Sequence, residues 1–349
     1  MGGNAVAPYV KTVRLDVENY KRLEAKTLSA LQKKFPNGRF NVVKYFTNKQ
    51  DFGDVDMMYH VEDNKACLEQ LPALLMEEFS ATKELPVVRN GSVTSVGVPV
   101  DTNEEDYFQL DFLYYSKENW DHAEFFLHYN DVGNLLGRVA RFAGFKLSDK
   151  GLLFPYKNEH GHVVKDLLVT KDPLETMKVL KLDKALYDKG MDSMEDVYHF
   201  VMSSDYFVRE TFLAENQNNG LRKREKKRGA YKLFLEYLES VELPSTTYSF
   251  EDKHLARLTA LEYAVDLLPE FKERYLETHK NAEFMRVFKK HFNGNLVTQL
   301  TGLTGKELGE FMKFLQGDNK AGFVNFVVFT PQSKVNEFVL NKFREFNSQ

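Results

Sequence analysis

The spacing of hydrophobic residues in the first third of the chain predicts an α+β fold. Apolar residues recur at mostly three- to five-residue intervals from 12 to 35, which predicts a helix that ends before a Pro-Asn-Gly turn. The β-branched and aromatic stretches NVVKYF and DVDMMYHV flank a polar turn, the pattern of an antiparallel hairpin. A helix at about 64–82 and strands at about 94–100 and 107–115 are expected to follow.

From about residue 117 the pattern becomes mainly helical. The segments WDHAEFFLHY, DVGNLLGRVARFAGF, DPLETMKVL and MEDVYHFVMSS predict helices, and GLLFPYKNEHGHVVKDLL predicts one hairpin. The polar stretch NQNNGLRKREKKRG is a candidate boundary between domains. We therefore expect three regions, 1–116, 117–214 and a helical C-terminal domain at 215–349.

Composition limits the classes of protein that the chain could belong to, and the sequence contains one cluster of basic residues. The net charge of −4 comes from 47 basic and 51 acidic residues, so attraction to a polyanion must be local. Six of the seven residues from 222 to 228 are basic. The single cysteine excludes an intramolecular disulfide, and no run has the length of a signal peptide core or a membrane span. We expect a complete, cytoplasmic or otherwise intracellular protein that does not enter a membrane.

Three aspartates on predicted strands are the candidate catalytic residues. Asp54 and Asp56 lie two residues apart, so their side chains project from the same face of a strand. Asp111 interrupts an aromatic strand, where an unpaired buried charge would be costly. On adjacent strands these carboxylates could hold two Mg²⁺ or Mn²⁺ ions, since hard divalent cations prefer oxygen ligands. On spacing alone, a solvated strand end remains the alternative.

The segment around these aspartates resembles a known superfamily. DFGDVDMMYHV is similar to the Gly-Asp-x-Asp-hydrophobic motif of the DNA polymerase beta-like nucleotidyltransferases. QLDFLYYSKENWDHAEFFLHYNDVGNLLGRVARFAGFKLSDKGLL resembles the family X polymerase stretch that follows the third catalytic aspartate. The resemblance implies a nucleotidyltransferase palm, a mixed sheet with helices, in which Asp54, Asp56 and Asp111 bind the catalytic metals.

The same resemblance implies contacts to nucleotide and nucleic acid. Gly53 takes the place of the motif's glycine, and Asn134 matches an asparagine that touches the incoming nucleotide. Arg138 matches an arginine that contacts nucleic acid. Tyr129 and Asn130 stand in the family's Tyr-Phe-Thr-Gly-Ser turn, although its threonine, glycine and serine are absent here.

One element of the family pattern is missing. About ten residues before the paired aspartates, the family has a Gly-Ser or Gly-Gly that binds triphosphate, and this chain has Val43-Lys44-Tyr45. Lys44 or Lys49 could supply positive charge to the nucleotide instead. The segment Gly2-Gly3-Asn4 could fold back as a substitute loop.

The C-terminal region adds candidate contacts to nucleic acid. A glycine turn at 302–306 separates two predicted helices in an order similar to the tail of CCA-adding enzymes and bacterial poly(A) polymerases, where Lys306 would approach phosphate. A helix-hairpin-helix or a plain αα-hairpin would give the same pattern. The basic cluster could follow a phosphate backbone through Arg222, Lys223, Arg224, Lys226, Lys227 and Arg228.

These features together predict a metal-dependent nucleotidyltransferase that uses nucleoside triphosphates. The leading hypothesis is template-independent addition of nucleotides to a nucleic-acid 3′ end, on RNA rather than DNA and possibly on tRNA. A family X-like DNA polymerase or terminal transferase is the alternative. A non-catalytic nucleic-acid-binding scaffold remains a third hypothesis, because the Gly-Ser motif is missing.

Overall fold

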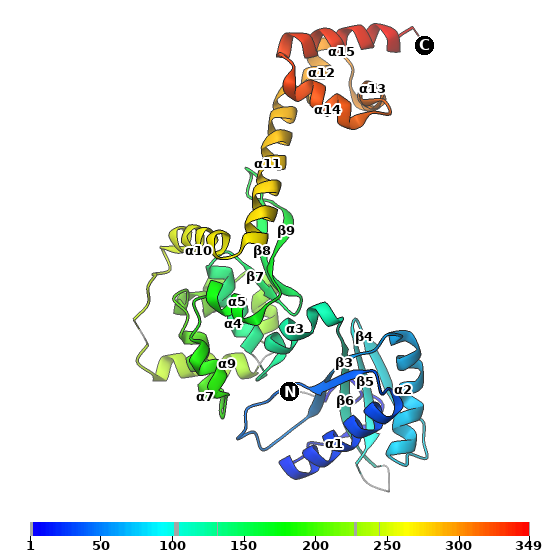
Figure 1. The fold of residues 1–349 in the computed structure, drawn as a ribbon, viewed down its shortest axis with the longest axis vertical. Helices are drawn as coiled ribbons and strands as arrows, with labels where there is room; N and C mark the ends of the chain where they lie inside the picture. Colours follow the sequence, from blue (N-terminus) through cyan, green and yellow to red (C-terminus); the bar gives the residue numbers. More distant parts are fainter. Residues whose placement is uncertain (1–2, 101–104, 131, 227–228, 244, 349) are drawn as a thin grey trace. The chain divides into compact units, whose positions relative to one another are not determined.

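The computed structural model describes residues 3–100, 105–130, 132–226, 229–243 and 245–348, with only the backbone of Arg224. The chain forms two compact units (Figure 1). The first comprises residues 1–157 and 161–271, and the second comprises 158–160 and 272–349. Each unit is described by itself. The architecture is α+β, as the sequence predicts, with a mixed sheet followed by a mainly helical region.

A mixed sheet dominates the N-terminal half of the first unit. Its strand order is β2-β3-β6-β5-β4, and β1 pairs with the start of β6. The strands β3 and β6 run parallel, whereas β2–β3, β5–β6 and β4–β5 are antiparallel pairs. The strands are β1 (Lys11–Thr12), β2 (Arg39–Val42), β3 (Asp54–His60), β4 (Val87–Asn90), β5 (Val93–Pro99) and β6 (Asp106–Tyr114). The predicted hairpin and the two further strands are therefore confirmed.

Two helices share a hydrophobic core with this sheet. They are α1 (Val17–Lys34) and α2 (Asn64–Glu78). The predicted first helix began too early, because Asp16 caps α1 by accepting a hydrogen bond from the amide of Asn19. Alternate residues of β3 and β6, including Val55, Leu110 and Phe112, face the core. Residues between them in sequence therefore project from the opposite face.

The rest of the first unit is mainly helical, with a small antiparallel sheet, β7-β8-β9. The predicted hairpin corresponds to β8 and β9, while β7 was not predicted from the sequence. The elements are α3 (Trp120–Leu127), α4 (Val132–Phe142), β7 (Lys146–Ser148), β8 (Gly151–Lys157), β9 (Val163–Thr170), α5 (Pro173–Val179), α6 (Lys184–Lys189), α7 (Met194–Met202), α8 (Asn219–Glu225), α9 (Gly229–Ser240) and α10 (Lys253–Leu267). Short 3₁₀ helices lie at Lys117–Asn119, Arg209–Phe212 and Ala214–Asn216.

Helix α11 (Pro269–His291) runs from the first unit into the second, where a separate phenylalanine-rich core joins the last helices. These helices are α12 (Gly294–Thr301), α13 (Gly305–Gln316), α14 (Lys320–Phe329) and α15 (Gln332–Phe346). The boundary between the compact units lies at residue 271, inside α11. The domain boundaries after 116 and 214 stay predictions from the sequence, and both fall within the first unit.

Candidate active site

The three aspartates lie together on the face of the sheet that points away from the α1–α2 core. In the parallel β3–β6 pair, Asp56 is directly opposite Asp111, and Asp54 is opposite Gln109. Ser95 of β5 is opposite Asp111 on its other side. Paired residues on adjacent strands share a face, so this register brings the three carboxylates into one cluster. The predicted placement on adjacent strands is what the structure shows.

Among the described residues, no lysine, arginine or histidine forms an ion pair with these three carboxylates, so their electrostatic repulsion is not relieved by direct contact with a cation. Asp56 keeps more than a third of its surface accessible to solvent, yet protein atoms crowd around its carboxyl group. Burial, and then the negative charges of Asp54 and Asp111, raise the pKa of Asp56 to about 7. Burial likewise raises the pKa of Asp111, and hydrogen bonds from Ser95 and Gln109 oppose that rise. The charged forms of both groups are therefore unfavourable in the protein alone.

The carboxylates fit divalent cations by their chemistry, because a cation would relieve the repulsion that raises these pKa values. They do not form a closed ligand set: within the described part of the chain, no group of three or more His, Cys, Asp or Glu side chains is arranged to hold a metal ion. Both Asp54 and Asp111 are engaged in hydrogen bonds. Oδ2 of Asp54 accepts from the amide of Gly3 at 3.0 Å, and both oxygens of Asp111 accept from Nε2 of Gln109 at 2.9 Å.

The two lysines predicted to bind nucleotide occupy different surroundings. Lys49 lies close to the cluster: burial lowers its pKa, while the charges of Asp54 and Asp56 raise it. Its ammonium group also lies 4.8 Å from the centre of the Phe52 ring. Lys44 is exposed and its charge acts on Glu124, whose pKa is lowered chiefly by a hydrogen bond from His128. The structure therefore brings Lys49, and not Lys44, to the aspartates.

The predicted nucleotide-binding turn has unusual backbone geometry. Tyr129 and Asn130 both have positive φ, at 55° and 64°, a region that residues other than glycine rarely adopt. The amide of Tyr129 donates to the carbonyl of Lys44 at 2.7 Å, which ties the turn to the end of β2. Strained backbone of this kind persists only where the surrounding structure holds it. The hydrogen bond to Lys44 supports this backbone conformation at Tyr129.

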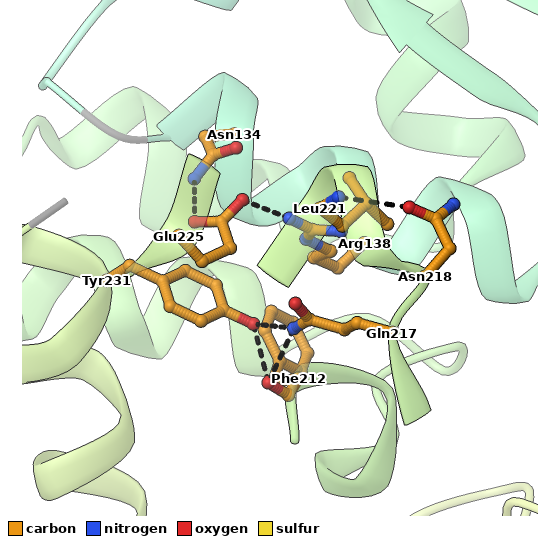
Figure 2. A network of polar contacts seen from close by, with 8 residues as sticks. All are labelled: Asn134, Arg138, Phe212, Gln217, Asn218, Leu221, Glu225 and Tyr231. Atoms are coloured by element: carbon orange, nitrogen blue, oxygen red, sulfur yellow. Dashed lines mark hydrogen bonds and ion pairs between the residues drawn. The ribbon is translucent and has the colours of Figure 1, made fainter. Parts of the chain in front are cut away.

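Asn134 and Arg138, which were predicted to contact nucleotide and nucleic acid, lie at a buried ion pair (Figure 2). The guanidinium of Arg138 is hydrogen bonded to Glu225, and both side chains are more than 90% buried. Nδ2 of Asn134 lies 3.4 Å from the same carboxylate. The Arg138 guanidinium also lies 5.7 Å from the centre of the Tyr231 ring. The polar groups of Asn134 and Arg138 that were predicted to contact nucleotide or nucleic acid are thus hydrogen bonded to Glu225.

The one acidic residue of the basic cluster at 222–228 is buried, whereas its described basic neighbours are exposed. Arg222, Lys223 and Lys226 are exposed at the end of α8, while Glu225 turns inward. Lys227 and Arg228 lie outside the described residues, as does the side chain of Arg224.

In the second unit, the predicted glycine turn lies between α12 and α13. Gly302 ends α12 in the left-handed conformation, with φ 76°. Lys306, in the first turn of α13, is exposed and lies 3.6 Å from Glu310. This geometry is that of two helices joined by a short turn, and it adds no contact beyond those expected of an αα-hairpin.

Several residues at the site could not be identified from the sequence. Gln109 and Ser95 support Asp111, and Glu225 pairs with Arg138. Gly3, in the segment that was predicted to fold back, contacts Asp54. Alternation along β6 gives a signal for Gln109, since it lies two residues before Asp111 and shares its face. No comparable signal exists for Glu225, which the sequence places among exposed basic residues.

Neither a family model nor a curated protein matches the chain. None of the helices among the described residues has the length and apolar composition needed to cross a membrane.

Proposed function

We propose that the protein is a metal-dependent nucleotidyltransferase that adds nucleotides to a nucleic-acid 3′ end. The observation that carries this proposal is the register of β3 and β6, which places Asp56 opposite Asp111 and next to Asp54 on one face. Three crowded carboxylates destabilise one another unless they bind cations. Their position near Lys49, the one predicted nucleotide-binding lysine that lies close to both paired aspartates, supports a site for an anionic substrate.

The aspartates have distinct roles in the proposed reaction. Asp54 and Asp56 would hold the cation on the nucleotide side and share a second with Asp111. Bound Mg²⁺ or Mn²⁺ ions would supply activation of the 3′-hydroxyl and neutralisation of the leaving pyrophosphate. The hydroxyl oxygen bonds to the α-phosphorus as the bond to pyrophosphate breaks. The hydroxyl proton passes to a base, and we assign this role to Asp111, the carboxylate placed closest to the attacking hydroxyl.

RNA is the proposed acceptor, with tRNA as one possible substrate. The exposed basic residues of α8 support a nucleic-acid partner, because clustered lysine and arginine attract phosphate backbones. Within the described residues they lie in the same compact unit as the aspartates. A family X-like DNA polymerase or terminal transferase would use the same cluster of carboxylates, so the acceptor must be identified by experiment.

The test is a transfer assay with the full chain. Wild-type protein and an Asp54→Ala/Asp56→Ala variant are incubated with Mg²⁺ or Mn²⁺, each labelled nucleoside triphosphate, and tRNA, single-stranded RNA or primed DNA. Extension of RNA by wild type alone supports the proposal, and extension of primed DNA alone would identify a DNA polymerase. The absence of incorporation on every acceptor, together with no metal-dependent triphosphate binding, would establish a non-catalytic scaffold.

A further inference from the structure

The segment Gly3–Val6 lies against the two strands that carry the aspartates. The amide of Gly3 donates to Oδ2 of Asp54 at 3.0 Å. The amides of Ala5 and Val6 donate to Oε1 of Gln109 at 2.8 and 3.2 Å. The side-chain amide of Gln109 in turn donates to both oxygens of Asp111. This segment therefore contacts one carboxylate directly and a second through Gln109.

The conformation of this segment requires glycine at one position. Gly3 is buried and has a φ of 83°, and a Cβ atom there would lie 2.2 Å from the carbonyl oxygen of Gly53. No other residue can make this close approach without moving the backbone. Val6 is fully buried and anchors the other end. The segment is thus held in place beside Asp54 from both sides.

Asn4 is the exposed residue between these two anchors. Neither its backbone amide nor its side chain forms a hydrogen bond with another described residue. Lys49, which the charges of Asp54 and Asp56 influence, lies near the same carboxylates. Unpaired amide donors next to Gly3, which contacts Asp54, match the needs of a metal-bound triphosphate, whose oxygens accept hydrogen bonds.

Residues 43–45 stand where the resembled family binds triphosphate, and two of them make contacts within the protein. The amide of Val43 donates to the carbonyl of Asp56 at 2.9 Å, which continues the β2–β3 hydrogen-bond ladder. The ring of Tyr45 packs edge-on against Tyr20, with centroids 5.3 Å apart, and against Phe52. The amide of Val43 is therefore not available to a phosphate, and the side chain of Tyr45 is held in aromatic packing.

We propose that the loop Gly3–Val6 binds the triphosphate of the incoming nucleotide, with the backbone and side-chain amides of Asn4 donating to phosphate oxygens. Gly3 positions the loop and Asp54, and Gln109 fixes the loop to Asp111. This inference rests on the proposed function of the same site. It assigns triphosphate binding to residues 3–6, whereas the resemblance places that role about ten residues before the paired aspartates.

The test measures binding without turnover. The affinity of the full chain for a fluorescent, non-hydrolysable nucleoside triphosphate is measured with Mn²⁺, and Mn²⁺ binding is measured separately by electron paramagnetic resonance. Asn4→Asp places a negative charge beside the phosphates on an exposed residue, and Gly3→Ala displaces the loop. Both variants are expected to weaken triphosphate binding at least about tenfold, and Asn4→Asp to leave Mn²⁺ affinity within about twofold.

The matched control is Gly91→Ala in the turn between β4 and β5. Gly91 also has positive φ, 60°, but a Cβ there would meet no atom within 4 Å, so this variant introduces backbone strain without disturbing the loop. Its triphosphate affinity should equal that of wild type. If wild type binds triphosphate and the Gly3 and Asn4 variants bind it equally well, the loop proposal is overturned while the proposed function stands. If wild type binds no nucleoside triphosphate, both are overturned.

Discussion

Two charged clusters in the first unit are built in opposite ways. Asp54, Asp56 and Asp111 are like charges on one face of a sheet, and two of them have raised pKa values. Arg138 and Glu225 are opposite charges in direct contact, buried among helices. The first cluster is destabilising by itself, whereas the second is satisfied within the protein.

This difference separates a cluster that a bound cation would stabilise from an ion pair that stabilises the fold. Like-charged groups gain by binding a cation, so the carboxylate cluster has a physical reason to bind metal. A buried ion pair has no such need, but removal of one partner leaves an uncompensated charge. Mutations of the aspartates should therefore lower activity without lowering stability, whereas mutation of the ion pair should lower stability.

The largest expected effect is on catalysis. Asp111→Asn keeps the size of the side chain but removes the negative charge and the proposed base. We expect kcat to fall at least about 1000-fold, equivalent to about 4 kcal/mol of transition-state stabilisation. Single-turnover incorporation of labelled nucleotide measures this loss. Asp51→Asn, at an exposed carboxylate that pairs with Arg14 at 2.6 Å, is the matched control and should retain wild-type kcat.

The second effect is on folding. Glu225→Ala leaves the buried guanidinium of Arg138 without its partner, so the free energy of unfolding should fall by about 3–5 kcal/mol. Urea unfolding followed by circular dichroism measures the change. Glu236→Ala removes one partner of an exposed pair with Lys232 and should cost less than about 0.5 kcal/mol. Equal losses for the two variants would contradict a structural role for the Arg138–Glu225 pair.

The third effect is a gain in the free energy of unfolding. The folded protein raises the pKa of Asp56 from 3.8 to about 7, so the contribution of this group to stability is lost as pH rises through that window. With a chelator present, Asp56→Asn should stabilise the protein at pH 8 by about 1–2 kcal/mol, a value reduced for the solvent exposure of Asp56.

The difference between Asp56→Asn and wild type should shrink as the pH falls to 4, where Asp56 is protonated in the folded state and partly protonated in the unfolded state. Urea midpoints from pH 4 to 8 measure it. A variant less stable than wild type at pH 8 would show that burial and the neighbouring carboxylates do not destabilise the charged form of Asp56 in the folded protein.

The smallest effect is on nucleic-acid affinity. Lys223→Ala removes one exposed charge from α8, and Lys226→Ala removes one from the residue directly after it. Each should reduce the slope of log affinity against log salt by about 0.7 for single-stranded RNA. Fluorescence anisotropy at several salt concentrations measures the slope. Lys65→Ala, at an exposed lysine on α2, should leave it unchanged. An unchanged slope in the α8 variants would remove this helix from the nucleic-acid interface.

The carboxylate cluster could be predicted from sequence because strand geometry is local. Side chains two residues apart on a strand share a face, so Asp54 and Asp56 follow from their spacing alone. Their proximity to Asp111 depends on which strands are neighbours, and only the resemblance indicated that. The structure shows the register directly.

The surroundings of Arg138 could not be predicted in the same way. A run of charge predicts a solvated helix face, but it does not show which single residue turns inward. Glu225 contacts a residue 87 positions earlier, a distance along the chain at which periodicity carries no information. The contact of Gly3 with Asp54 spans 51 positions and was suggested only by the missing Gly-Ser motif.

The most direct test of the central claim is Mn²⁺ binding, followed by electron paramagnetic resonance with and without each nucleoside triphosphate. Wild type and the Asp54→Asn/Asp56→Asn variant are titrated under the same conditions, with Asp51→Asn as control. We predict that wild type and the control bind Mn²⁺ more tightly when triphosphate is present, and that the double variant binds at least about tenfold more weakly. Equal Mn²⁺ affinity in wild type and the double variant would contradict a metal site at these aspartates.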